Sequence, residues 1–122
     1  VDRIREALEV DMTVDITTTG RKTGSPRRIE IWSQDFDGRT IIAGSPGRRG
    51  WYANLVANPI TYHLKGAVRA DQAAVARPVV GMSERRAILG RLREVSRFRQ
   101  EQGMQDLESW VEGSALVEVT FK

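Results

Sequence analysis

A glycine-rich, basic turn between two β-rich segments constrains the fold of this chain more than any other feature. The segment TTTGRKTGSPRR, residues 17–28, overlaps the β-branched stretch 14–19 and leads into the alternating stretch 29–36. Gly20 and Gly24 permit the positive φ angles of a tight turn. A connection this short favours antiparallel pairing of the strands it joins. The sequence therefore predicts a β-hairpin with cationic side chains at its turn.

The other elements follow from alternation, apolar spacing and turn residues. Asp37-Gly38 is a hairpin signal. Asn58-Pro59 ends a helix, because a residue before proline avoids the α region. Ser83 is a suitable N-cap. The predicted helices are residues 3–10, 51–58 and 83–102, with a short helical segment at 104–111, and the further strands are residues 40–43, 60–64, 68–80 and 115–121.

Short connections between successive strands indicate the fold class. They favour antiparallel pairing over βαβ crossovers. About six antiparallel strands with two or three flanking helices fit a small β-barrel better than an open sheet. With 122 residues, the chain suits a single domain with one core, residues 1–122.

Composition excludes several kinds of site. The chain has no cysteine, so disulfides, thiolate metal sites and cysteine nucleophiles are excluded. Its single histidine, His63, rules out a zinc or haem site built from several histidines, and no metal site is predicted. No apolar run approaches the ~20 residues that span a membrane. The expected location is cytoplasmic.

Positive charge is concentrated in one part of the chain. The net charge is +3, and the acids between Gly20 and Gly50 are outnumbered by basic residues. A local basic patch attracts anions, although a merely solvated face is the plain alternative. The basic residues of this segment are Arg21, Lys22, Arg27, Arg28, Arg39, Arg48 and Arg49.

The basic turn has the chemistry of an anion site. Successive backbone amides in such a turn can form a nest for an anion. Lys22 adds a point charge, and Arg21 or Arg27 can grip an oxyanion with two hydrogen bonds. Thr23 offers a hydroxyl donor. A hairpin loop that is basic without binding anything is the alternative.

A second candidate region is the loop and helix at residues 44–58. Arg48 and Arg49 precede a helix N-terminus, which also attracts anions. Trp51 and Tyr52 could stack on a planar ligand. Alternatively, Trp51 simply packs the helix on the barrel.

Other polar residues carry weaker signals. His63 is expected to be a satisfied or surface histidine, since nothing nearby in the sequence completes a triad. A nucleic-acid partner is not predicted, because few aromatic residues interleave with the basic ones. The arginines expected to be solvated are Arg85, Arg86, Arg91, Arg93, Arg97 and Arg99.

Two motifs in this order resemble the deazaflavin-dependent nitroreductase and quinone reductase family. TTTGRKTGSPRR is followed by a strand, a DG hairpin and SPG…GWYANLVANP, and the similarity covers about residues 14–66 well. The resemblance implies the split β-barrel of FMN-binding proteins and the cofactor coenzyme F-420, with FMN as the alternative cofactor.

The resemblance also implies roles for individual residues. Ser45 and Trp32 match positions close to the substrate, and both are predicted as catalytic-site residues. The cofactor phosphate and acidic tail would lie against Arg21, Lys22, Thr23 and Arg27. The ring would be bordered by Ser45, Pro46, Gly47 and the N-terminus of the helix beginning near Trp51. Arg48 or Arg49 would replace a cation that the family carries in a longer loop.

The function implied is hydride transfer from reduced coenzyme F-420 to a small planar acceptor, quinone-like or a nitro compound. The family's nitro-reducing members carry tyrosines where Met104 and Leu107 stand here, so bulky nitro substrates are not expected. Alternatives are a non-catalytic protein that binds a cofactor or lipophilic ligand, or an FMN- or haem-binding barrel. Monomer and homodimer both stay open, as does proximity to a membrane surface.

Overall fold

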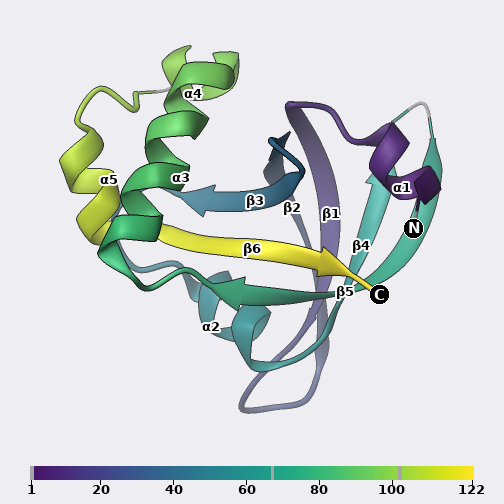
Figure 1. The fold of residues 1–122 in the computed structure, drawn as a ribbon. Coiled ribbons are helices and arrows are strands. Elements are labelled where there is room, and N and C mark those ends of the chain that lie inside the picture. Colours follow the sequence, from purple (N-terminus) through teal and green to yellow (C-terminus); the bar gives the residue numbers. More distant parts are fainter. Residues whose placement is uncertain (1, 67, 102) are drawn as a thin grey trace.

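The computed structural model describes residues 2–66, 68–101 and 103–122, which form a closed barrel of six strands with five helices around it (Figure 1). The order around the barrel is β1-β2-β3-β6-β5-β4, and β4 returns to pair with β1. Every pair is antiparallel, which confirms the predicted fold class. The elements are α1 (Asp2–Ala7), β1 (Asp11–Thr19), β2 (Pro26–Phe36), β3 (Arg39–Gly44), α2 (Gly50–Ala57), β4 (Ile60–Lys65), β5 (Arg69–Pro78), α3 (Met82–Val95), α4 (Arg97–Glu101), α5 (Leu107–Gly113) and β6 (Ala115–Phe121).

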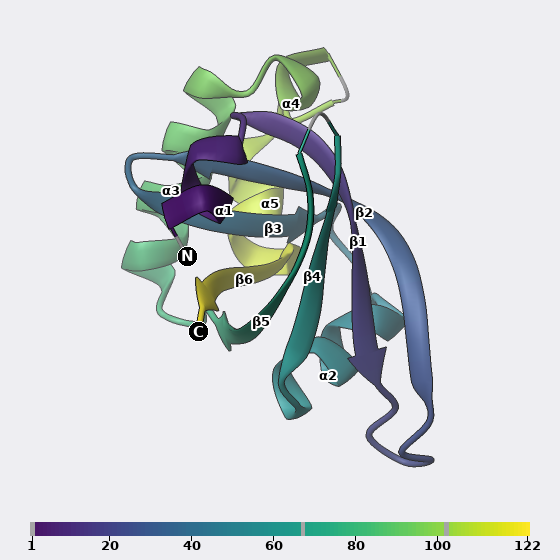
Figure 2. The same ribbon diagram turned by 90° about the vertical axis from the view of Figure 1, so that its right-hand side faces the viewer.

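Both predicted hairpins at the start of the barrel are confirmed. β1 pairs with β2 along its whole length, from Asp11 opposite Gln34 to Thr19 opposite Pro26. The β2–β3 turn has positive φ at both central residues, Asp37 and Gly38, as the tightest hairpin turns require. The β1–β2 hairpin extends below the barrel and carries the basic turn at its tip (Figure 2).

The interior consists of two hydrophobic clusters. One fills the barrel, and α2 caps its lower end by inserting the fully buried Leu55 (Figure 1). The other lies between the β3–β6 side of the barrel and helices α3 and α5, where Leu89 and Trp110 are buried. Inward-facing residues on the strands alternate with outward-facing ones, as Val14, Ile16 and Thr18 do on β1.

The predicted helix over residues 83–102 is instead two helices. α3 begins at Met82, with Gly81 rather than Ser83 as its N-cap, and ends at Val95. Ser96 then adopts extended backbone angles, and its hydroxyl donates to Asp11 Oδ1 at 2.6 Å. This contact, between residues far apart in the chain, explains the break. The predicted end at residue 102 lies outside the described residues.

The expectation that the α3–α4 arginines are solvated is wrong for two of them. Arg85 and Arg99 are each only 7% exposed. Arg99 donates to the carbonyl of Ala43 and lies against the rings of Phe98 and Trp110, at 4.9 and 5.2 Å from their centroids. Burial lowers the pKa of Arg99 to about 10. Both arginines are therefore part of the packed interior.

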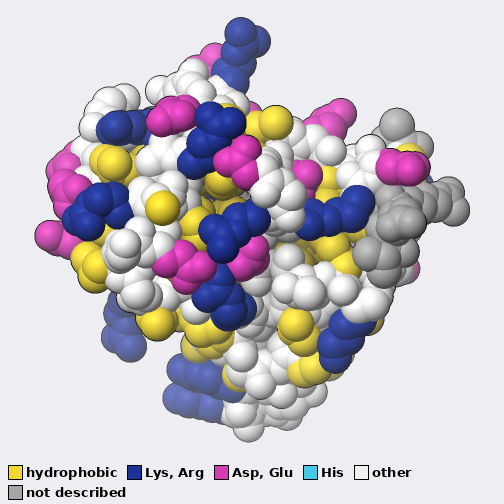
Figure 3. Space-filling view, viewed as in Figure 1, with side chains coloured by type: hydrophobic (Ala, Val, Ile, Leu, Met, Phe, Trp, Pro, Cys, Tyr) yellow, Lys and Arg dark blue, Asp and Glu magenta, His cyan; other side chains and the backbone are white. Residues whose placement is uncertain are grey.

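Acidic and basic side chains are interspersed over the face formed by α3, β5 and β6 (Figure 3). Arg77 donates to Glu84 and Glu118, and Arg39 contacts the same two carboxylates. Among the residues described, no helix is long and apolar enough to cross a membrane.

Candidate functional site

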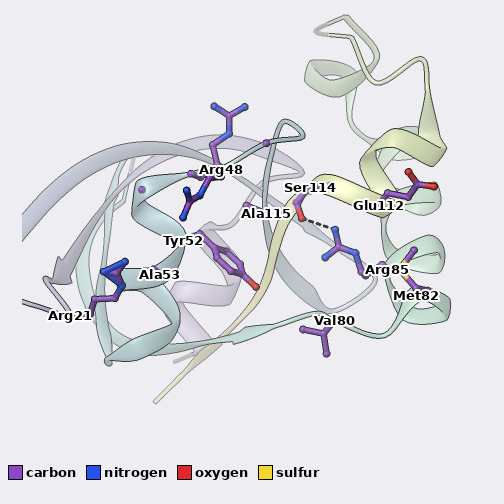
Figure 4. Close-up of a pocket in the computed structure, with 14 residues that line it drawn as sticks. Arg21, Arg48, Tyr52, Ala53, Val80, Met82, Arg85, Glu112, Ser114 and Ala115 are labelled. Carbon is purple, nitrogen blue, oxygen red and sulfur yellow. Dashed lines mark hydrogen bonds between the residues drawn. The ribbon is translucent and has the colours of Figure 1, made fainter.

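A cavity of about 630 Å³ opens between the arginine loop, α2, α3 and the α5–β6 junction (Figure 4). Here the arginine loop means residues 45–50. Its walls come from four separate parts of the chain, which only the closed barrel brings together. The residues that line it are Arg21, Gly47, Arg48, Arg49, Gly50, Tyr52, Ala53, Val80, Met82, Arg85, Glu112, Gly113, Ser114 and Ala115.

A smaller hollow of about 270 Å³ lies at the β1–β2 turn. It is formed by the turn itself and by one residue of α2, Asn54. Arg21 lines both this turn hollow and the larger cavity, so the two adjoin at that side chain. The remaining residues of the turn hollow are Gly20, Lys22, Thr23, Ser25, Pro26 and Arg27.

Internal hydrogen bonds hold the turn in place and occupy several of its amides. Gly20 N donates to Ser25 O at 2.9 Å, and Gly24 N donates to Gly20 O at 2.8 Å. Gly24 has φ 72°, which favours glycine. Arg21 N donates to Asn54 Oδ1 at 3.1 Å and so ties the turn to α2. Because these amides already have acceptors, anion binding here depends mainly on side chains.

The cations around the two hollows differ in their salt-bridge partners from the cations on the rest of the surface. Within the described part of the chain, five of them are exposed and form no salt bridge. A group of cations without counter-charges creates a local positive potential that attracts an anionic ligand. These side chains are Arg21, Lys22, Arg27, Arg48 and Arg49.

The arginine loop is short and fixed at both sides. Arg49 donates from Nε and from an Nη to Ser45 O, at 3.1 and 3.0 Å. Gly47 N donates to Gly113 O at 3.2 Å, and a Cβ at Gly113 would meet Pro46 Cβ at 3.3 Å. The loop therefore lies directly against the α5–β6 junction and forms one rim of the cavity.

Only some of the residues predicted to contact the cofactor ring line the cavity. Gly47, Arg48 and Arg49 line it. Ser45 and Pro46 are exposed and immediately precede these residues, but do not line it themselves.

Trp51 is half-buried and packs on the barrel core, where its ring would contact a Cβ at Gly44. From α2 it is Tyr52 and Ala53 that face the cavity. This packing agrees with the packing alternative of the sequence analysis, and a contact of Trp51 with a cofactor ring stays a prediction.

Trp32 lies elsewhere on the barrel. Its ring stacks on Phe98 with centroids 4.1 Å apart and planes 18° from parallel. It lines neither the cavity nor the turn hollow. Its assignment to the substrate site, like that of Ser45, stays a prediction.

Sequence reasoning missed Arg85, which lines the cavity although it is nearly buried. Its guanidinium donates to the carbonyls of Val79, Val111 and Ser114 at 2.6–2.7 Å and to that of Trp110 at 3.4 Å. Burial lowers its pKa from the ordinary value.

A signal for the burial of Arg85 was present in the sequence. Arg85 precedes Ile88, Leu89 and Leu92 by three, four and seven positions, the spacing of one helix face. Position 85 therefore belongs to the buried face of the helix. Because arginine is usually exposed, the residue type led to the wrong expectation.

His63 has hydrogen-bond partners on both sides, from neighbouring strands. Its Nε2 lies 2.7 Å from Thr17 Oγ1 on β1, and its Nδ1 lies 2.7 Å from Asp71 Oδ1 on β5. The array resembles a triad in connectivity, which proximity in sequence could not reveal. It lies apart from the two hollows described above.

Comparison with known proteins identifies relatives of this chain. F420H(2)-dependent quinone reductases from two strains of Mycobacterium tuberculosis are 46% identical to it over 46 residues, which cover 34% of this chain and 31% of each relative. The match thus spans less than a third of the relatives' length.

Solved structures support the fold alone. The structure titled FAD and Heme binding protein from Mycobacterium smegmatis has a TM-score of 0.61 and 14% identity, covering 98% of this chain and 65% of that chain. Another solved chain has a TM-score of 0.57 and 20% identity, covering 98% and 78%.

The family assignment comes from a model that extends over most of the sequence. The model described as F420H(2)-dependent quinone reductase, where F420H(2) is reduced coenzyme F-420, matches residues 3–112. The match includes the basic turn, the arginine loop and α3. The chain therefore belongs to the F420H(2)-dependent quinone reductase family.

Proposed function

We propose that this chain is a reductase that uses reduced coenzyme F-420 to reduce a small planar acceptor of the quinone type. One observation carries the proposal beyond family membership. A hollow surrounded by exposed cations without salt bridges in the described residues adjoins, through Arg21, a cavity of about 630 Å³. Such a volume is typical of a site for a cofactor or drug-sized ligand.

The residues present fit an anionic, planar cofactor. Arg21, Lys22, Thr23 and Arg27 would hold its phosphate and acidic tail, because arginine forks and lysine charges bind oxyanions. Its ring would lie in the larger cavity, near the residues that follow. The residues of the arginine loop and of α2 that line this cavity are Gly47, Arg48, Arg49, Tyr52 and Ala53. Ser45, Pro46 and Trp51 adjoin them in the sequence.

The chemistry needs little from the protein beyond position and charge. When bound, the reduced coenzyme supplies the hydride, and the protein supplies orientation and electrostatics. The arginine loop and α2 lie on one side of the cavity, and α3 and the α5–β6 junction lie on the other (Figure 4). Ser45, exposed at the rim, is the hydroxyl that we propose to pass a proton from water to the reduced acceptor. A place for Trp32 beside the acceptor stays a prediction, and in this structure its ring stacks on Phe98.

Titration of the protein with oxidised coenzyme F-420, followed by fluorescence, tests the proposal, with FMN titrated in parallel. The double variant Arg21→Ala/Lys22→Ala should bind F-420 at least about 30-fold more weakly, since two charge-assisted contacts are lost. Arg93→Ala/Arg97→Ala, with the same loss of charge on the α3–α4 side, should bind normally. Equal affinity in all three proteins would show that the cofactor site is elsewhere.

One observation favours a second function on the same cavity. Val80 and Met82 are 74% and 47% exposed at its rim, and both line it. An exposed apolar rim suits a lipophilic ligand. A non-catalytic binding protein would take up coenzyme F-420 or a lipophilic quinone without turnover. Steady-state reduction of a quinone series by the loaded protein would exclude this alternative.

A further inference from the structure

Arg85 is a buried cation whose partners are dipoles rather than charges. Charged side chains are seldom this buried unless a counter-charge accompanies them. In the described chain Arg85 contacts four carbonyl oxygens and forms no salt bridge with a carboxylate. Glu112 lines the same cavity but points away from Arg85 (Figure 4). The positive charge of Arg85 is therefore not neutralised inside the protein.

The guanidinium of Arg85 is oriented towards the cavity and retains a free donor. Figure 4 shows it pointing inward from α3, toward the hydroxyl of Tyr52 on the opposite wall. A guanidinium has five N–H groups. The four bonds to carbonyls use Nε, one hydrogen of Nη1 and both of Nη2, so a hydrogen of Nη1 is left without an acceptor in the described residues.

A second unsatisfied donor lies beside Arg85. Ser114 also lines the cavity and is 6% exposed, and its Oγ has no hydrogen-bond partner among the described residues. Buried hydroxyls without a partner are uncommon in folded proteins and costly. The carbonyl of Ser114 accepts from Arg85 at 2.6 Å, so the two residues are held side by side. Both residues therefore line the same end of the cavity.

We propose that Arg85 and Ser114 form an oxygen-binding subsite at the α3 end of the cavity, which takes a carbonyl oxygen that becomes negative during reduction. This inference rests on the proposed function and names the chemistry that the site would recognise. The oxygen belongs either to the acceptor or to the ring of the cofactor. Both carry conjugated carbonyls that accept hydrogen bonds, but the negative charge of the reaction develops only on the acceptor, because the cofactor gives up the hydride.

The electron count explains why a cation is useful at this place. Addition of hydride to a conjugated dicarbonyl acceptor forms one new bond to hydrogen, while a C–H bond of the hydride donor breaks. The electron pair of a C=O π bond moves onto oxygen, which stays negative until water protonates it. Preorganised donors stabilise such a developing charge strongly in a site shielded from water. Arg85 supplies a permanent positive charge that needs no proton from the reaction.

A matched pair of small ligands tests the subsite. 1,4-Naphthoquinone carries the carbonyl oxygens, and naphthalene has a similar shape without them. The chain has no cysteine, so the quinone finds no thiol to alkylate. The ¹⁵N–¹H signal of Arg85 Nε, protected by its bond to Val111 O, reports contact in solution. Naphthoquinone should shift this signal, and naphthalene should not.

Two variants and two control variants measure how much this contact contributes to the affinity for naphthoquinone. Ser114→Ala removes a hydroxyl that bonds to nothing in the described chain, so it should fold normally and bind naphthoquinone about fivefold more weakly. Arg85→Lys should weaken it about tenfold or more, provided thermal unfolding shows it folded. The controls are Ser83→Ala and Arg86→Lys on the exposed face of α3. Affinity for naphthalene should be the same in all proteins.

Coenzyme F-420 identifies the source of the oxygen. A shift of Arg85 Nε by F-420 alone, with weaker F-420 binding in Ser114→Ala, assigns the oxygen to the cofactor. A shift only when naphthoquinone joins the F-420-loaded protein assigns it to the acceptor. Normal F-420 binding with no response of Arg85 to either ligand overturns the subsite alone. A naphthoquinone response in a protein that does not bind F-420 supports the subsite and overturns the proposed function.

Discussion

The cations of the α3–β5–β6 face and those around the β1–β2 turn have opposite surroundings. On the α3–β5–β6 face, Arg77 donates to Glu84 at 2.8 and 3.0 Å and to Glu118 at 2.7 Å. Arg39 joins the same carboxylates. Around the turn, the cations that line the turn hollow form no salt bridge within the ranges that the structure describes, whereas Arg28, which does not line it, pairs with Asp15 at 2.9 Å. Cations whose acceptors lie inside the protein support the fold, whereas exposed cations without a counter-charge are free for a ligand.

This contrast separates two kinds of experimental effect. Removing a cation that the fold uses should lower stability and leave the affinity of the turn hollow unchanged. Removing a cation from the turn should do the reverse. The following changes test the contrast from the largest expected effect to the smallest.

Arg85→Ala should have the largest effect on stability. The change leaves four buried carbonyls without their donor and opens space in the interior, which we expect to cost about 3–5 kcal/mol in the free energy of unfolding. Urea unfolding followed by tryptophan fluorescence measures this. Arg86→Ala, next to it on the exposed side of α3, is the matched control and should change little. A similar midpoint for both variants would contradict the structural role of Arg85.

Asp11→Ala should come next. The carboxylate accepts from Ser96 Oγ at 2.6 Å and from Phe98 N at 3.1 Å, and so holds the start of α4. Its loss should cost about 2 kcal/mol, since three buried or half-buried donors, Gln34 Nε2 among them, lose their acceptor. Hydrogen exchange at the Phe98 amide should accelerate more than exchange in β1. Unchanged protection at Phe98 would mean that Asp11 does not cause the helix break.

Stability should fall in acid because of the paired face. Hydrogen bonds from Arg77 hold the pKa of Glu84 below its ordinary value. A depressed folded-state pKa contributes stability that is present above the unfolded-state pKa and is lost as pH falls through the folded one. The unfolding midpoint should therefore decline below about pH 4.5. Glu84→Gln should start lower at pH 7 and lose part of that decline, and an unchanged slope would argue against this pairing.

Arg48→Ala should have the smallest effect on stability. The side chain is exposed and has no salt bridge in the described residues, so the unfolding midpoint should stay the same. F-420 binding should weaken and become less dependent on salt, because one attractive charge is removed. Titrations at low and moderate ionic strength measure both. A lowered midpoint without a change in binding would reverse the proposed contrast.

Local signals predicted the β1–β2 and β2–β3 hairpins well. Strand alternation and the Asp37-Gly38 pair act over a few residues, and the structure has both φ angles positive there. The helix break at Ser96 was not predictable in the same way, because its cause is Asp11, on β1. The first strand also starts earlier than predicted, at Asp11 rather than at residue 14, since pairing with Gln34 extends it.

The candidate site was predictable in part. The unpaired cations of the turn and of the arginine loop were identified from their types and positions. Arg85 was missed because residue type outweighed its position on the buried face of α3. The partners of His63 were missed because Thr17 and Asp71 reach it only through the pairing of β1, β4 and β5.

The sequence by itself determined the hairpins, the basic turn and the resemblance to a family, because each depends on neighbouring residues. Only the tertiary structure decided which cations are neutralised and which are free, because their partners come from other strands and helices. It also decided the cavity, whose walls at Arg21, Tyr52, Arg85 and Ser114 meet when the barrel closes. Burial, pairing and cavity shape are properties of contacts between distant residues, and those contacts exist only in the folded chain.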